Sequence, residues 1–381
     1  MELRDDGIVS LINALESKSK NVHTQSLDLS FNELLDMKKS GELDITPDFQ
    51  RLFRWTEGAR SRFIESLLLE MPVPPIYVVE ESDGKYMLID GLQRISSYLH
   101  LRGELSAQHL DEPVAVGDKL VLTDCDIVHE LNGKTFDDLG TALQIRLKRA
   151  FVRVEVVRKG SDPHFKYHMF KRLNTGGEIL SPQQIRNCTI RLLNPRFIEF
   201  NLELSQEEVF KSCTESLTYE QKLAAFDQEL VLRFIGLKNN RDGFKHDVGD
   251  FMTEYMEKVS EPGDTSFDYV QEKAVFLKTF TILWRTLGEY AFAYENKKKK
   301  TDLTKAFGIY HYESFTVGLQ RQLNLIDPED ETLIGRLSTA FKEVKHNEEF
   351  IGMTTGGGKN SRGLLRDRVK FVEDKIETVL I

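Results

Sequence analysis

The chain has 381 residues, of which 40% are hydrophobic, and its formal net charge is −10. This length and apolar content suffice for two ordinary hydrophobic cores and exclude a fibrous or wholly disordered protein. The acidic balance disfavours a protein that coats nucleic acid without specificity, because like charges oppose approach to phosphates. No apolar run has the length of a membrane span or the form of a signal peptide, so we expect a cytoplasmic protein without a membrane partner.

The first half of the chain alternates helical and strand patterns. Ser30 and Glu33 form a capping box that opens a helix to about Lys39, and residues 58–70 have the spacing of a second helix. Strands are predicted over residues 76–80, 86–90 and 151–157, the first two joined by an Asp-Gly turn. Helices at about 137–150, 163–173 and 182–193 complete the set. Residues 103–135 read as an irregular insertion with a further strand over residues 120–127.

The second half is dominated by helical spacing of apolar residues and has few strand patterns. Helices are predicted over residues 219–237, 251–259, 266–294 and 329–345. We therefore predict an α+β domain over residues 1–194, followed by a mainly α-helical domain over residues 195–381.

The most informative segment is residues 86–102, where an apolar strand ends at Asp90-Gly91 and an amphipathic helix begins at once. Glycine permits a sharp turn, and the first amides of a helix lack intrahelical partners, so backbone donors and Arg94 converge on any anion there. Asp90, at the end of the strand, is placed to hold a metal ion or a water beside that anion. A plain turn followed by a solvated arginine fits the same residues.

A second cluster lies upstream, in residues 46–55, where Arg51 and Arg54 are flanked by Phe49, Phe53 and Trp55. Aromatic neighbours can fix a guanidinium group by packing and cation–π contact, and a fixed arginine binds phosphate at a lower entropic cost. The alternative is an aromatic strip of the core with incidental surface charges.

A third cluster begins with the turn Asn174-Thr175-Gly176-Gly177 and continues into Ser181-Pro182-Gln183-Gln184. The serine, the proline at the first helical position and the glutamine three residues after the cap predict a helix start. This is a second helix N-terminus preceded by glycines, although a purely structural helix–loop–helix has the same appearance.

In this order the clusters resemble the family known as domain of unknown function 262. Its members combine a Gln-Arg-x-x-x-Trp element, an Asp-Gly-Gln-Gln-Arg motif and an Asn-Thr-Gly-Gly loop. The matching pieces are Gln50-Arg51 with Trp55, residues 90–94 and residues 174–177, and the resemblance spans about residues 25–190. Leu92 replaces the first glutamine of the usual motif, which puts any role of that amide in doubt.

The resemblance implies a fold similar to ParB and sulfiredoxin, with a nucleotide site at the Asp-Gly-Gln-Gln-Arg motif. Similar domains, such as the N-terminal domain of GmrSD-type modification-dependent restriction systems, hydrolyse nucleoside triphosphates and control a nuclease. For this chain it implies ATP or GTP with Mg²⁺, Asp90 and Arg94 as catalytic residues, and Asp90 as metal ligand. The residues expected to bind nucleotide and phosphate are Arg51, Arg54, Gly91, Gln93, Arg94, Asn174, Thr175, Gly176 and Gly177.

Charge is unevenly distributed along the chain. Residues 144–191 carry eleven Lys and Arg against three Asp and Glu. A basic face on an acidic protein suits a specific anionic partner, either a nucleotide or a short length of DNA. We expect Arg149, Lys171 and Arg172 to contact DNA, while a solvated face balanced by acidic neighbours is the alternative.

Other catalytic or metal chemistry has little support. The cysteines at 125, 188 and 213 lack metal-binding or disulfide spacing, which indicates reduced thiols. The glycines at 356–358 precede a lysine without the spacing of a phosphate-binding loop, and no histidine-based metal motif or known nuclease domain is recognisable. Any cutting of DNA is then expected from a partner nuclease chain.

Three functional interpretations remain open. The first is an NTP-binding and NTP-hydrolysing protein of an antiviral restriction system that senses DNA or controls a partner nuclease. The second is a sensor that binds nucleotide or DNA without turnover. The third is a ParB-like nuclease using Asp90 with Asp48 or Glu65, although the sequence places no second carboxylate beside Asp90. The base, the DNA modification, the partner and the oligomeric state are not given by the sequence.

Overall fold

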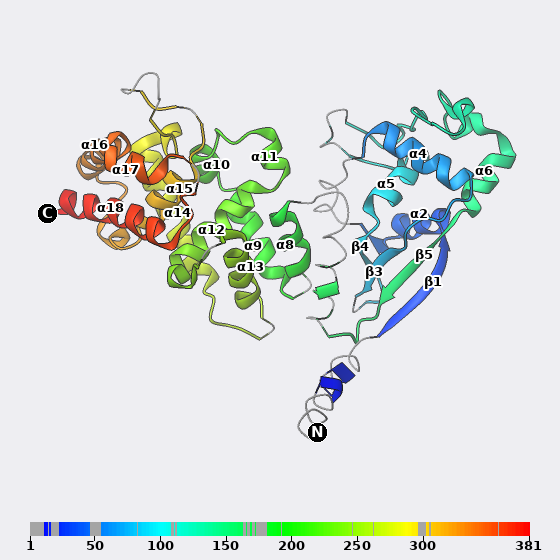
Figure 1. Cartoon of the computed structure of the whole chain (residues 1–381), viewed down its shortest axis with the longest axis horizontal. Helices are drawn as coiled ribbons and strands as arrows, with labels where there is room; N and C mark the ends of the chain where they lie inside the picture. Colours follow the sequence, from blue (N-terminus) through cyan, green and yellow to red (C-terminus); the bar gives the residue numbers. More distant parts are fainter. Residues whose placement is uncertain are drawn as a thin grey trace, which may run out of the picture. The chain divides into compact units, whose positions relative to one another are not determined.

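A computed structural model describes residues 11–13, 15–16, 23–45, 55–81, 83–107, 110, 113–162, 165, 168–169, 172, 181–191, 193–245, 247–261, 263–295, 302–304, 306–356 and 358–381. The chain divides into two compact units, Met1–Ile179 and Leu180–Ile381. The first, hereafter the sheet unit, carries the β-strands β1 to β5, and the second, hereafter the helical unit, is built of helices (Figure 1).

The sheet unit contains a five-stranded sheet in the order β1-β5-β3-β4-β2. The strands are β1 (Thr24–Ser30), β2 (Leu43–Asp44), β3 (Ile76–Glu80), β4 (Tyr86–Asp90) and β5 (Phe151–Val157). β1 pairs with β5 and β3 pairs with β4 in antiparallel fashion, whereas β3–β5 and β2–β4 are parallel pairs. Because β3 and β4 are antiparallel, with Tyr77 opposite Asp90, the end of β4 lies beside the start of β3.

Helices cover one face of this sheet: α2 (Phe31–Ser40), α4 (Glu57–Leu68), α5 (Leu92–Leu101) and α6 (Gly140–Arg149), with short 3₁₀ turns at His129–Leu131 and Asp137–Leu139. Phe31 lies between two other rings, with centroids 5.6 Å from Phe63 and 5.5 Å from Tyr98. These rings share one core with Val152 and Val154 of β5. Since burying one such side chain contributes about 1.5–3 kcal/mol, this contact fixes α4 and α5 on the sheet.

The strands predicted over residues 76–80, 86–90 and 151–157 are confirmed as β3, β4 and β5. The strand predicted over residues 120–127 is wrong, because these residues form no strand. Leu120 and Leu122 are fully buried, so the apolar alternation reflects a loop packed on the core. Strands β1 and β2 were not predicted from the sequence, because β1 is half exposed and polar and β2 has only two residues.

The helical unit is formed by α8 (Pro182–Arg191), α9 (Pro195–Ser205), α10 (Glu208–Cys213), α11 (Tyr219–Leu223), α12 (Phe226–Asn240), α13 (Val248–Val259), α14 (Tyr269–Leu287), α15 (Ile309–Gly318), α16 (Glu331–His346), α17 (Glu348–Thr354) and α18 (Arg362–Leu380), with short 3₁₀ turns at Arg241–Gly243, Gly288–Tyr290 and Leu323–Leu325. The single helix predicted over residues 219–237 is divided into α11 and α12 at Ala225, whose φ is +56°.

Buried ion pairs connect the helices of this unit. Glu229 bonds Arg186 at 2.8 Å and Arg233 at 3.2 Å, and Glu313 bonds Arg233 at 2.6 Å and also binds Arg368. Removing one member of such a set leaves a buried charge without compensation, which costs about 3–5 kcal/mol. The set therefore ties α8, α12, α15 and α18 into one body.

The predicted α+β fold with a mainly helical C-terminal region is confirmed. Among the helices described, none combines the length and the apolar character needed to cross a lipid bilayer.

Candidate nucleotide-binding site

The junction between β4 and α5 has the geometry that the sequence predicts. Gly91 caps α5 with a φ of +114°, in the region that favours glycine. A Cβ atom at this position would lie only 2.7 Å from Cγ1 of Ile76. The backbone of Gly91 thus passes directly over the start of β3, and no larger residue fits the turn.

Asp90 and Arg94 bind each other across this turn. Nη2 of Arg94 donates to Oδ2 of Asp90 at 2.8 Å and to the carbonyl oxygen of Pro75 at 3.1 Å. The Arg94 side chain is only 14% exposed, against 40% for Asp90. The alternative interpretation, in which Arg94 is a solvated side chain, is therefore wrong, because the Asp90 carboxylate and the Pro75 carbonyl hold its guanidinium group in place.

Arg94 retains unused hydrogen-bonding capacity. Among the residues that the structure describes, its buried Nε atom has no acceptor, and no side chain caps the N-terminus of α5. A buried donor without a partner costs about 1–3 kcal/mol, and an oxygen of an anionic ligand would satisfy it. The donors predicted at this junction are thus present together: a guanidinium group and an uncapped helix N-terminus.

A chain of hydrogen bonds supports the junction from the side of α4. The amide of Trp55 donates to Oε1 of Gln93 at 3.2 Å, and Nε of Arg60 donates to the carbonyl oxygen of Trp55 at 2.7 Å. Nη1 of Arg60 lies 3.0 Å from Nδ1 of His100. Burial, and then the charge of Arg60, lower the pKa of His100 to about 4. A neutral imidazole accepting from Arg60 follows, because a guanidinium group can only donate.

Glu65 has a structural role between α4 and the loop of residues 120–135. Its buried carboxylate accepts from the amides of Ile127 and Val128 at 3.1 and 2.6 Å and so ties the loop of residues 120–135 to α4. This occupation argues against Glu65 as the second carboxylate of a nuclease. In the part of the chain that the structure describes, no group of three or more His, Cys, Asp or Glu side chains could hold a metal ion.

Several predicted site residues lie outside the described residues: Asp48, Arg51, Arg54, Lys171, Asn174, Thr175, Gly176 and Gly177. The helix start after them is confirmed. Ser181 Oγ accepts from the amide of Gln184 at 3.2 Å, and Oε1 of Gln184 accepts from the amide of Ser181 at 3.0 Å. Because these groups cap α8 themselves, its first turn offers fewer donors to an anion than that of α5.

The residues predicted to contact DNA are exposed where the structure describes them, namely Arg149 at the end of α6 and Arg172. Arg60, Pro75 and His100 were missed as supports of the junction. Pro75 belongs to the proline-rich entry into β3, but Arg60 and His100 carry no motif, and 40 positions separate them.

The cysteines that the structure describes with their side chains, Cys125 and Cys213, are free and buried. Burial raises the pKa of Cys125 to about 11 and raises that of Cys213 further. Such thiols are unreactive at neutral pH. Near the glycines at 356–358, the carbonyl oxygen of Lys359 accepts from Nη1 of Arg368 at 2.7 Å, and Arg362 pairs with Asp242. These contacts attach that loop to the helical unit.

The family model of the GmrSD restriction endonuclease, N-terminal domain, matches residues 31–191. This match confirms the resemblance to the domain of unknown function 262 family, and it covers the β4–α5 junction. No curated protein and no solved structure matches the chain. The likeness to ParB and sulfiredoxin accordingly stays a prediction.

Proposed function

We propose that this protein binds and hydrolyses a nucleoside triphosphate at the β4–α5 junction and acts in restriction of foreign DNA, as a sensor of DNA or a regulator of a partner nuclease. The observation that carries the proposal is the arrangement of Arg94: within the described part of the chain, its buried Nε lacks an acceptor beside an uncapped helix N-terminus. The match of residues 31–191 to the restriction endonuclease domain supports the defence role.

In this proposal the Asp90–Arg94 pair belongs to the ligand-free state. A terminal phosphate is an acceptor for bidentate, charge-assisted bonds and competes with Asp90 for the guanidinium group. Once Arg94 turns to the phosphate, the half-exposed Asp90 carboxylate is released. That carboxylate would then be available to orient a water or to hold Mg²⁺, an ion that commonly takes only one or two protein carboxylates. Bound Mg²⁺ would supply neutralisation of the developing phosphate charge.

Calorimetry with ATP and GTP tests the binding step. Arg94→Gln is expected to weaken binding roughly 10- to 150-fold, the equivalent of one charge-assisted contact. Arg94→Lys should recover part of the affinity, since a point charge cannot reproduce the guanidinium fork. Arg62→Gln makes the same charge change at an exposed position of α4 and should leave the affinity unchanged. Equal affinities of Arg94→Gln and the parent protein would refute the site.

Phosphate release separates an enzyme from a sensor. Asp90→Asn keeps an acceptor for Arg94, so we expect retained binding and loss of magnesium-dependent phosphate release. Asp83→Asn, in the exposed turn between β3 and β4, is the matched control. Binding without turnover in the parent protein, with or without DNA, would leave the sensor function in place of the hydrolase.

A further inference from the structure

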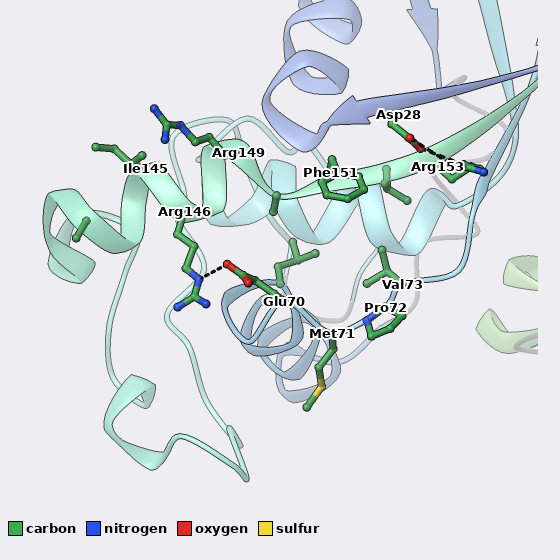
Figure 2. A pocket seen from close by; sticks show the side chains of 14 residues that line it. Asp28, Glu70, Met71, Pro72, Val73, Ile145, Arg146, Arg149, Phe151 and Arg153 are labelled. Carbon is green, nitrogen blue, oxygen red and sulfur yellow. Dashed lines mark hydrogen bonds and ion pairs between the residues drawn. The ribbon is translucent and has the colours of Figure 1, made fainter.

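An open pocket of about 850 Å³ lies in the sheet unit (Figure 2), and none of residues 90–94 is among those that line it. Its walls come from the end of α4 with residues 70–73, from the last turns of α6, and from the first residues of β5. Its volume falls in the range of about 300–1,000 Å³ that is typical of sites for small organic ligands. We call it the Phe151 pocket.

Large apolar side chains of this pocket are exposed to solvent. Phe151 is 67% exposed, Met71 42% and Ile145 41%. They come from three different segments, all of which line this pocket (Figure 2). A gathered apolar surface of this kind marks a place where a ligand or partner is bound.

Arginines also line the Phe151 pocket, namely Arg146, Arg149 and Arg153. Nε of Arg146 donates to Oε1 of Glu70 at 2.9 Å, and Arg153 forms two bonds to Asp28, at 3.0 and 3.1 Å. Arg149 is exposed, and among the described residues no hydrogen bond or ion pair reaches its side chain. Exposed ion pairs contribute only about 0–1 kcal/mol, so Arg146 and Arg153 can exchange their carboxylates for phosphate at little cost.

We propose that the Phe151 pocket binds an unpaired nucleotide of a nucleic-acid strand, with the base stacked on Phe151 and the flanking phosphates on Arg149 and Arg153. An exposed aromatic face with arginines on both sides is the combination that binds single strands, because every base has a π-face and every linkage a negative charge. Phe151 and Arg153 lie on one side of β5, about 6.8 Å apart along the strand. The Phe151 ring and the Arg153 guanidinium group are therefore neighbours on the same face of β5.

This inference rests on the proposed function in one respect, that nucleic acid is the partner. It does not depend on the nucleotide site at the β4–α5 junction. It is tested by fluorescence anisotropy of the whole chain with labelled oligonucleotides of thymidine or uridine, about 12 residues long. Binding of either oligonucleotide in preference to the corresponding duplex is expected. Phe151→Leu should weaken it roughly 5- to 150-fold, and Phe151→Tyr should preserve it.

Arg149→Gln should weaken binding and lower the slope of log K against log salt by about 0.7, the value for one phosphate contact on a single strand. The matched controls are Tyr219→Leu and Arg321→Gln, which alter an exposed ring and an exposed charge of the helical unit and should change nothing. Absence of oligonucleotide binding at low salt, or equal binding by Phe151→Leu and the parent protein, overturns the inference.

The outcomes for the two sites are distinguishable on the same preparations. Retained binding of ATP or GTP together with no oligonucleotide binding overturns the Phe151 pocket alone. Oligonucleotide binding that depends on Phe151, in a protein that binds no nucleoside triphosphate, supports the pocket and refutes the proposed nucleotide site.

Discussion

Acid is expected to destabilise the sheet unit through His100. The side chain is 3% exposed, and its pKa falls from 6.5 to about 4 in the folded protein. Between these pH values His100 binds a proton in the unfolded chain but not in the folded protein. The free energy of unfolding therefore decreases as the pH falls from about 6.5 towards 4. With 1.36 kcal/mol per pH unit, the loss is about 2 kcal/mol at pH 5 and approaches about 3 kcal/mol below pH 4.

The chain has two tryptophans, Trp55 in the sheet unit and Trp284 in the helical unit. Because Trp284 is 41% exposed, Trp284→Phe should cost little and would leave Trp55 as the fluorescent reporter of the sheet unit. Urea unfolding of this variant at several pH values between about 5 and 7.5 measures the free energy of unfolding.

His100→Asn is the diagnostic substitution, because its amide oxygen can accept from Arg60 but does not titrate. In the Trp284→Phe background it should reduce the loss between pH 7.5 and 5 by about 2 kcal/mol. Parallel pH profiles with and without His100 would refute the reasoning, since the acid sensitivity would then come from other groups.

Substitutions at three further positions test the surrounding structure by urea unfolding. Glu65→Ala leaves two loop amides without their acceptor and should cost about 2–4 kcal/mol, whereas Glu65→Gln should cost less. Gly91→Ala forces a side chain into a positive φ and into contact with β3, so we expect a loss of at least about 2 kcal/mol; an unchanged midpoint would contradict the described turn. Arg368→Met removes a partner of the buried Glu313 and should destabilise the helical unit by about 3–5 kcal/mol. The fluorescence of Trp284 reports the unfolding of that unit.

The elements that sequence reasoning recovered are those with a strong local pattern. The β3–β4 hairpin, the turn at Gly91 and the cap at Ser181 each depend on neighbouring residues, whose propensities agree with the fold. Strand β1 was not predicted because it lacks such a local pattern. Its residues alternate weakly, and it forms because Leu27 and Leu29 pack on the core while Asp28 pairs with Arg153 across the sheet.

At the β4–α5 junction, the sequence predicts the turn and its neighbouring side chains but not the bonds between them. Asp90 and Arg94 were both predicted at the junction, yet their ion pair depends on the positive φ of Gly91 and on the position of the Pro75 carbonyl. The support by Arg60 and His100 joins two helices through a contact between distant positions. No periodicity in the sequence encodes such a pair, since each residue alone resembles an ordinary helical side chain.

The most direct test of the nucleotide site is a crystal structure of the protein with Mg²⁺ and a non-hydrolysable analogue of ATP or GTP. The account predicts a phosphate oxygen within hydrogen-bonding distance of Arg94 Nε and of the first amides of α5, with the Asp90–Arg94 pair opened. A nucleotide bound elsewhere, or one bound at the junction with that pair intact, would contradict it.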